Sequence, residues 1–196
     1  MVQSIVAWPR AAEDMLIARF SMRSFLAVWK TCDITANLLA HVLSRRYHEP
    51  DVEEYVLSTV INELLEAVHR RHARLPDEAL QTLAFSVGVQ RVGEAGTGAL
   101  ETAAGVSSET AVGDRLRVAL VLALPDAGGQ RPFFEEIVQA LSRESAQTIY
   151  WRILERGEEF DGAGLLEIAT NYGVALEMQA PCDAHPYEYR VIAELA

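Results

Sequence analysis

The sequence predicts an α+β fold, a two-layer sandwich in which helices cover one face of a mixed, mostly antiparallel sheet. Three observations support this: helical patterns cluster early, strand patterns follow one another in the middle, and a second helical group precedes two terminal strands. A doubly wound fold would instead alternate strands with helices. Because the chain has 196 residues and half of them are hydrophobic, residues 1–196 are expected to form a single domain.

The first half of the chain combines one strand with a helical group. Residues 15–20 are short and apolar, as in a strand, and residues 25–43 carry apolar side chains at the spacing of one or two helices. These helices are expected to end before Pro50, because the residue before a proline disfavours helix. The strongest helical pattern runs from Asp51 to His72.

The second half begins with strand patterns and returns to helices before the last strands. A stretch of small residues at about 93–113 is expected to be a flexible loop, or a loosely packed hairpin connection, between the strands predicted at 80–92 and 115–124. The predicted strands are 80–92, 115–124, 175–180 and 187–195. The predicted helices are 133–141, 148–156 and 165–172.

The composition narrows the classes of partner. A formal charge of −11 and a pI near 4.9 would repel phosphate backbones and anionic lipid surfaces, so neither nucleic acid nor a membrane is expected. Cys32 and Cys182 lack the spacing of a metal site and suit free thiols in a reducing compartment. No leader-like start or long apolar run is present, so a cytoplasmic location is expected.

Glu63 lies at the border of the apolar face of the helix predicted at 51–72. Asn62 and Glu66 are expected on its solvent side. A partly desolvated carboxylate has a raised pKa and can orient a water or a hydroxyl group. The same position also suits an acid that simply reaches water at the rim of the core. Both readings remain open.

The stretch NELLEAVHRRH, residues 62–72, resembles the N-box of the GHKL (Bergerat-fold) ATPases. The resemblance is to the branch of anti-sigma factor serine kinases and SiaB-type partner-switching regulators, whose motif runs Asn-Glu-Leu-Leu-Glu-Asn-Ala. In that family the first glutamate is the general base, and an asparagine four residues later holds Mg²⁺. Glu63 matches the base, but Ala67 stands at the asparagine position. Asn62 lies about 100° around the helix from Glu63, so it cannot take over the role of the missing asparagine.

The family resemblance returns near the C-terminus, where DGAGLLEIATNYGVALEM, residues 161–178, is similar to the second glycine box. Gly162 and Gly164 would let backbone N–H groups approach a phosphate at a helix N-terminus. In the family an Asp-x-Gly-x-Gly segment binds the adenine amino group, and Asp126 with Gly128 is a degenerate copy of it. The same residues also suit a plain turn. FSMRSFLAVWKTCDITANLLAHVL, residues 20–43, also resembles the N-terminal part of these regulators.

The resemblance implies a signalling regulator that binds ATP or ADP, with Mg²⁺ in catalytic members, and a STAS-domain partner protein. Homodimers are also compatible with it. Because Ala67 removes the expected Mg²⁺ ligand, the alternative is a catalytically inactive protein-interaction module that keeps the fold. A metal site at Glu66, His69 and His72 is a weaker hypothesis, since a solvated helix end explains the same pattern. No nucleophile elbow supports acyl transfer.

Overall fold

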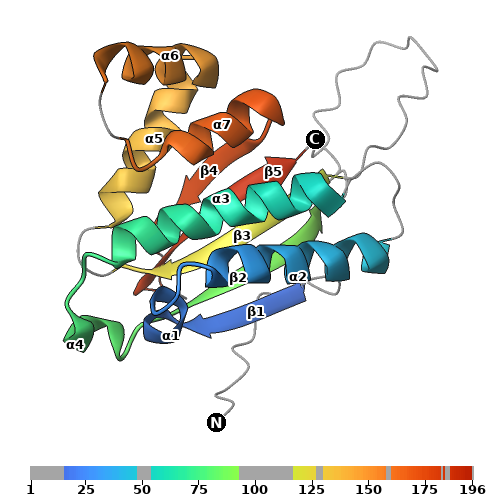
Figure 1. The fold of residues 1–196 in the computed structure, drawn as a ribbon, viewed down its shortest axis with the longest axis vertical. Helices are drawn as coiled ribbons and strands as arrows, with labels where there is room; N and C mark the ends of the chain where they lie inside the picture. The colour runs from blue at the N-terminus through green and yellow to red at the C-terminus, as the bar shows by residue number, and fades with distance from the viewer. Residues whose placement is uncertain are drawn as a thin grey trace, which may run out of the picture.

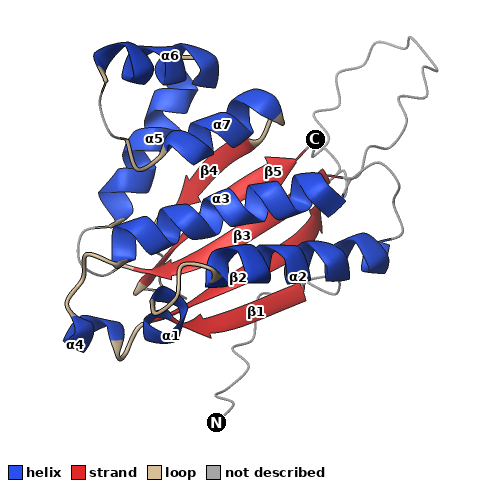
Figure 2. Cartoon of the chain, in the orientation of Figure 1, coloured by secondary structure: helices blue, strands red, loops and turns tan. Residues whose placement is uncertain are grey.

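The computed structural model describes residues 16–47, 54–92, 117–126, 130–157, 160–181, 183 and 186–195. Within these ranges a five-stranded sheet has helices gathered on one face (Figures 1 and 2). The strand order is β1-β2-β3-β5-β4, and each neighbouring pair is antiparallel. The predicted α+β sandwich is confirmed, but the described sheet is antiparallel throughout rather than mixed.

The elements follow the order that the sequence predicts. The strands are β1 (Leu16–Ser21), β2 (Ala84–Val92), β3 (Arg117–Pro125), β4 (Ala175–Gln179) and β5 (Glu188–Leu195). The helices are α1 (Met22–Leu26), α2 (Thr31–Tyr47), α3 (Glu54–His72), α4 (Asp77–Leu80), α5 (Arg131–Arg143), α6 (Ala146–Arg156) and α7 (Ala163–Asn171).

The largest local difference from the prediction lies before β2. The sequence places a strand from Leu80, but this residue ends the short helix α4, and the strand begins at Ala84. Pro76 caps α4 with φ −65°, and two acidic residues follow it in the first turn, which favours a helical start. The loop predicted at 93–113 and Asp51 lie outside the described residues.

The core lies between the sheet and α3. On β5, buried residues alternate with half-buried ones, as expected for a strand with one face on the core. On β3, Leu120, Leu122 and Leu124 are buried in the same cluster as Leu64 and Leu65 of α3. Helix α3 crosses the middle of the sheet, and α7 lies next to it (Figure 1). This arrangement sets the position of the candidate site.

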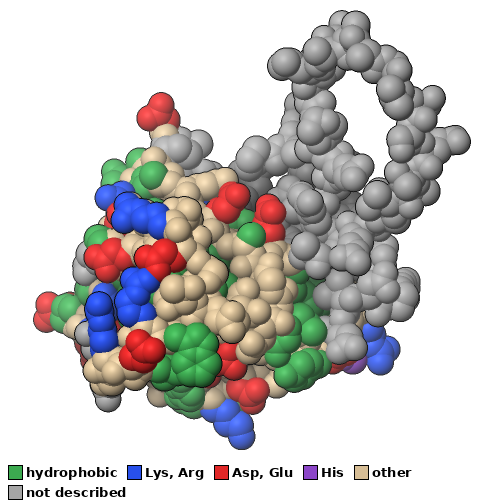
Figure 3. Space-filling view, turned by 90° about the horizontal axis from the view of Figure 1, so that it is seen from above, with side chains coloured by type: hydrophobic (Ala, Val, Ile, Leu, Met, Phe, Trp, Pro, Cys, Tyr) green, Lys and Arg blue, Asp and Glu red, His purple; other side chains and the backbone are tan. Residues whose placement is uncertain are grey.

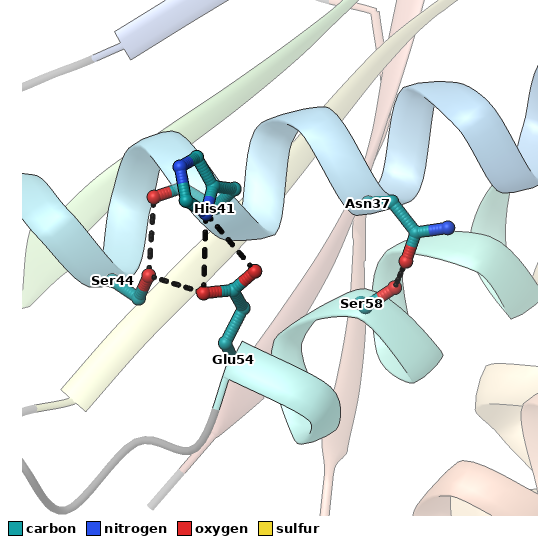
Figure 4. Close-up of polar contacts among 5 residues, drawn as sticks. All are labelled: Asn37, His41, Ser44, Glu54 and Ser58. Atoms are coloured by element: carbon teal, nitrogen blue, oxygen red, sulfur yellow. Dashed lines mark hydrogen bonds and ion pairs between the residues drawn. The ribbon is translucent and has the colours of Figure 1, made fainter.

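Polar side chains join α2 to α3 on the helical layer. Asn37 accepts a hydrogen bond from Ser58 at 2.6 Å, and Glu54 contacts both the imidazole of His41 and the hydroxyl of Ser44 (Figure 4). Glu54 lies between the other two groups, and the Ser44 hydroxyl donates to the carbonyl of His41 rather than to its ring. These residues therefore tie two helices together and do not form a hydrolase triad.

Tyr189 offers a stability test of the core. Its side chain is fully buried, and its hydroxyl has no hydrogen-bond partner within the described part of the chain. Burial raises the pKa of the phenol, and the nearby Asp126 carboxylate raises it further. Since an unpaired buried hydroxyl carries a desolvation cost, Tyr189→Phe is expected to raise the free energy of unfolding by about 1 kcal/mol. Urea denaturation measures this, and a loss of stability would mean that the hydroxyl is hydrogen-bonded in solution.

Candidate functional site

Helices α3 and α7 lie side by side and run antiparallel. At one end, Arg71 Nη1 lies 3.0 Å from Asp161 Oδ2, just before α7. At the other end, the hydroxyls of Tyr55 and Tyr172 are 3.0 Å apart. Between them, Glu63 meets the first turn of α7 at Gly164. The structure thus brings the acid of the N-box-like stretch against the glycine pair.

The contact between Glu63 and Gly164 depends on the missing side chain of the glycine. A Cβ built at Gly164 would lie 2.7 Å from the Cδ atom of Glu63, closer than two carbons approach without a bond. The carboxylate therefore occupies the space beside the first turn of α7, where an anion is favoured by the helix dipole. In the described structure this space holds the chain's own acid.

Burial raises the pKa of the Glu63 carboxyl, and the neighbouring Glu66 carboxylate raises it further. Glu66 in turn receives hydrogen bonds from Asn62 at 2.9 Å and from Arg70 at 2.6 Å. These side chains are half-buried rather than solvated, so the solvent side predicted for Asn62 and Glu66 is wrong. The reason is that α1 and the turn before α2 pack against this flank of α3, with Arg70 over the ring of Trp29.

The raised pKa of Glu63 leads to a pH-dependent prediction. A group whose pKa is higher in the folded state stabilises the fold at low pH and loses that contribution as the pH rises through the folded value. Glu63→Gln is therefore expected to raise the free energy of unfolding at pH 7 by roughly 0.5–1 kcal/mol, and by less at pH 4. Thermal unfolding at both pH values measures the difference. Destabilisation at pH 7 would show instead that the ionised carboxylate binds the N-terminus of α7 favourably.

Ala67 lies one turn beyond Glu63 and is almost completely buried. Its methyl group packs in the core cluster and offers no oxygen to a cation. No group of three or more possible metal ligands occurs among the described residues. The residues present therefore do not fit the Mg²⁺ site that the family resemblance implies.

His69 and His72 are buried, so the prediction that they belong to a solvated helix end is wrong. His69 packs edge-on against Trp29, with ring centroids 4.6 Å apart. The Nδ1 atom of His72 lies 2.9 Å from the carbonyl oxygen of Val68. Burial lowers the pKa of both rings. They belong to the core rather than to a metal site.

Gly162 has a packing role in this structure. It is buried, and a Cβ there would lie 2.6 Å from Ile137 Cδ1 and 2.8 Å from the ring of Phe160. Apolar side chains therefore fill the space beside this backbone, and its φ of −97° is open to other residue types. Close packing explains this glycine without a phosphate.

Asp126 lies directly after β3, at the position predicted for the adenine-binding acid. Its carboxylate lies 3.2 Å from Arg131 Nη1, and its backbone N–H donates to the carbonyl of Tyr187 at 2.8 Å. Gly128 falls outside the described residues. The acid is therefore held near the start of α5, beside a cation.

A cavity of about 390 Å³ opens where three segments meet. These are the end of α3, the start of α5, and the residues just before α7. The residues that line it are Arg71, Arg74, Pro132, Phe133, Glu136, Phe160 and Asp161. Each segment neighbours one of the stretches that resemble the GHKL motifs, although Glu63, Gly162 and Gly164 do not line the cavity.

The cavity combines two arginines with aromatic rings. The guanidinium of Arg71 lies over the ring of Phe133, 4.3 Å from its centroid. The carboxylate of Asp161 binds both Arg71 at 3.0 Å and Arg74 at 2.8 Å. Asp161, the acid just before Gly162, is therefore compensated by Arg71 of α3 and by Arg74 just after that helix, which the sequence did not predict. On the face shown in Figure 3, acidic and basic side chains likewise lie beside one another.

The sequence alone did not point to the arginines and the aromatic residues of this cavity. The spacing of Arg71 and Arg74 is three residues at a helix end, which places both on one side of the helix. This spacing was the one available indication. Pairing with Asp161, some ninety residues later, follows only from the antiparallel packing of α3 and α7.

Comparison with known proteins adds no family to this description. The chain matches no protein-family model, no curated protein and no solved structure. Among the described residues, no helix is both long enough and apolar enough to cross a membrane.

Proposed function

We propose that this chain is a Bergerat-type signalling regulator that binds an adenine nucleotide in the cavity between α3, α5 and the start of α7. The observation that carries the proposal is a cavity of about 390 Å³ at which three segments meet, each of them adjoining a stretch that resembles a family motif. This volume lies within the usual range of about 300–1,000 Å³ for small-molecule sites. The resemblance to anti-sigma factor serine kinases supplies the ligand class and a STAS-domain protein as the regulated partner.

The side chains of the cavity suit a nucleotide. Phe133 and Phe160 offer apolar surface to a purine, and Arg74 offers a guanidinium that is 63% exposed. The Nε–H of Arg71 is buried and has no hydrogen-bond partner within the described part of the chain. A phosphate group would compete with Asp161 for the two arginines.

Titration calorimetry with ADP and ATP, each with and without Mg²⁺, tests this proposal. We expect binding that weakens about tenfold in Arg74→Ala, since this substitution removes one charged hydrogen-bond donor. Arg19→Ala, on the exposed surface of β1, is the matched control and should leave the affinity unchanged. No binding of either nucleotide at millimolar concentration would remove the nucleotide from the proposal.

A catalytically inactive interaction module is the second candidate, and two observations favour it. The Glu63 carboxylate occupies the space beside Gly164, and Ala67 is buried at the position of the missing metal ligand. Incubation with labelled ATP and a STAS-domain partner separates the candidates. Phosphate transfer to the partner that is lost in Glu63→Ala would establish catalysis, and its absence would leave the interaction module.

A further inference from the structure

Helix α2 has two apolar faces, of which the fold uses one. The inner face packs in the core through a buried row of side chains that includes Ala36, Leu39 and Leu43. On the outer face, Ile34 is 58% exposed, and Leu38, four residues later, is 61% exposed. Val42 continues the row at 38% exposure. This spacing places the three side chains in one line along the helix, which we call the α2 stripe.

A basic residue stands near each end of the α2 stripe, and one exposed acid, Asp33, lies beside Ile34 in the first turn of the helix. Lys30 precedes the helix, Arg45 lies in its last turn, and both are exposed. Neither makes an ion pair with the part of the chain that the structure describes. The acid of this helix, Asp33, accepts a hydrogen bond from Asn37 instead.

The polar residues of α2 point elsewhere. Asn37, His41 and Ser44 lie on the side that faces α3, where they contact Ser58 and Glu54 (Figure 4). The α2 stripe is therefore an apolar line with an exposed cation near each end, on a chain whose formal charge is −11.

A second copy of the chain fits this surface poorly. Lys30 stands eight residues before Leu38, and Arg45 stands seven residues after it. Antiparallel packing of two α2 helices about Leu38 would place Lys30 of one copy beside Arg45 of the other. Parallel packing would place each cation beside its own equivalent. Both arrangements bring like charges together, in addition to the repulsion between two acidic chains.

A membrane surface fits poorly as well. Each cation near an anionic leaflet contributes about 1 kcal/mol, and the stripe has two such cations on a strongly acidic chain. A partner surface that has an apolar row with an acid near each end matches both the aliphatic side chains of the stripe and its two cations. A helix that presents apolar side chains at three- and four-residue spacing packs along such a row at a small crossing angle.

We propose that the α2 stripe is the docking surface for an acidic amphipathic helix of a partner protein. The three aliphatic side chains form the contact, and Lys30 and Arg45 pair with acids at the two ends of the partner helix. The proposal does not rest on nucleotide binding, because no residue of the stripe lines the cavity. A failed nucleotide titration therefore leaves it unaffected.

A synthetic peptide tests the proposal directly. The probe is a labelled helical peptide with leucines along one face and glutamates on both flanks, titrated with the full chain at about 0.15 M salt. Fluorescence anisotropy is expected to give a dissociation constant on the order of 10–100 µM, as for small transient contacts. Leu38→Ser and the double variant Lys30→Glu, Arg45→Glu should each weaken binding by about tenfold or more.

Matched variants and two further measurements complete the test. Leu154→Ser, at an apolar side chain on α6 that is 51% exposed, and Arg19→Glu on β1 should leave peptide binding unchanged. Absence of binding, or equal loss in the control variants, overturns the proposal. So does a concentration-dependent dimer in sedimentation that Leu38→Ser dissolves, since the occupant is then a second copy. Binding to anionic vesicles that Leu38→Ser abolishes assigns the surface to a membrane and also overturns it.

Discussion

Gly162→Ala is expected to lower the free energy of unfolding by about 1–3 kcal/mol, the usual cost of overpacking a core. The added methyl carbon would lie 2.6 Å from Ile137 Cδ1 and 2.8 Å from two ring atoms of Phe160. Ile137 is buried on α5 and Phe160 packs against the core, so both must move together. The backbone of Gly162 has a negative φ, so the cost is steric and not conformational. Urea denaturation of the unmodified chain and of the Gly162→Ala variant measures this loss of stability.

Gly164→Ala is the matched control for this substitution. There the added carbon would meet the carboxylate end of Glu63, 2.7 Å from its Cδ and 3.4 Å from its Cγ. A carboxylate at the end of a flexible chain can rotate away, so we expect a clearly smaller loss of stability. Equal losses for the two variants would contradict the assignment of Gly162 to core packing.

The second large effect is a loss of stability in acid that depends on His72. This side chain is fully buried, and burial lowers its pKa from the ordinary value of 6.5. As the pH falls below 6.5, the unfolded chain takes up a proton that the folded chain does not. The free energy of unfolding should then fall by up to about 1.4 kcal/mol per pH unit until the folded pKa is reached.

His72→Phe should remove the part of this dependence that comes from His72, while His69, whose pKa burial also lowers, keeps its own part. Phenylalanine keeps an aromatic ring of similar size in the core and cannot be protonated. Denaturant titrations between pH 7 and pH 5 would follow the slope in both proteins. Tyr189→Phe, at a buried ring whose phenol stays protonated in this pH range, should leave the slope close to that of the unmodified chain. An unchanged slope in His72→Phe would mean that another group controls the acid response.

Hydrophobic periodicity was sufficient to predict most of the fold. The row from Leu57 to Val68 identified α3, and the alternation near the C-terminus identified β5. These patterns report which side of an element is buried, and that is a local property of the sequence. The start of β2 was predicted too early, because the Leu80 region is apolar whether it forms a strand or the short helix α4.

The candidate site was harder to predict because its residues come from distant segments. The structure places Glu63 of the N-box-like stretch in contact with Gly164 of the stretch that resembles the second glycine box. The same geometry makes both glycines positions of close packing, which no sequence pattern distinguishes from a phosphate-binding turn. Their roles in nucleotide binding stay predictions.

By itself the sequence determined the class of fold, the order of its elements, the acidic character of the chain and the absence of a metal ligand at Ala67. Only the tertiary structure decided that Arg71 and Arg74 neutralise Asp161, that His72 is buried, and that the α2 stripe is exposed. The physical reason is that local spacing fixes which face of a helix is apolar. What that face meets depends on elements that lie far away in the sequence, such as Asp161, ninety residues after Arg71. Charge compensation and burial arise only when those elements pack.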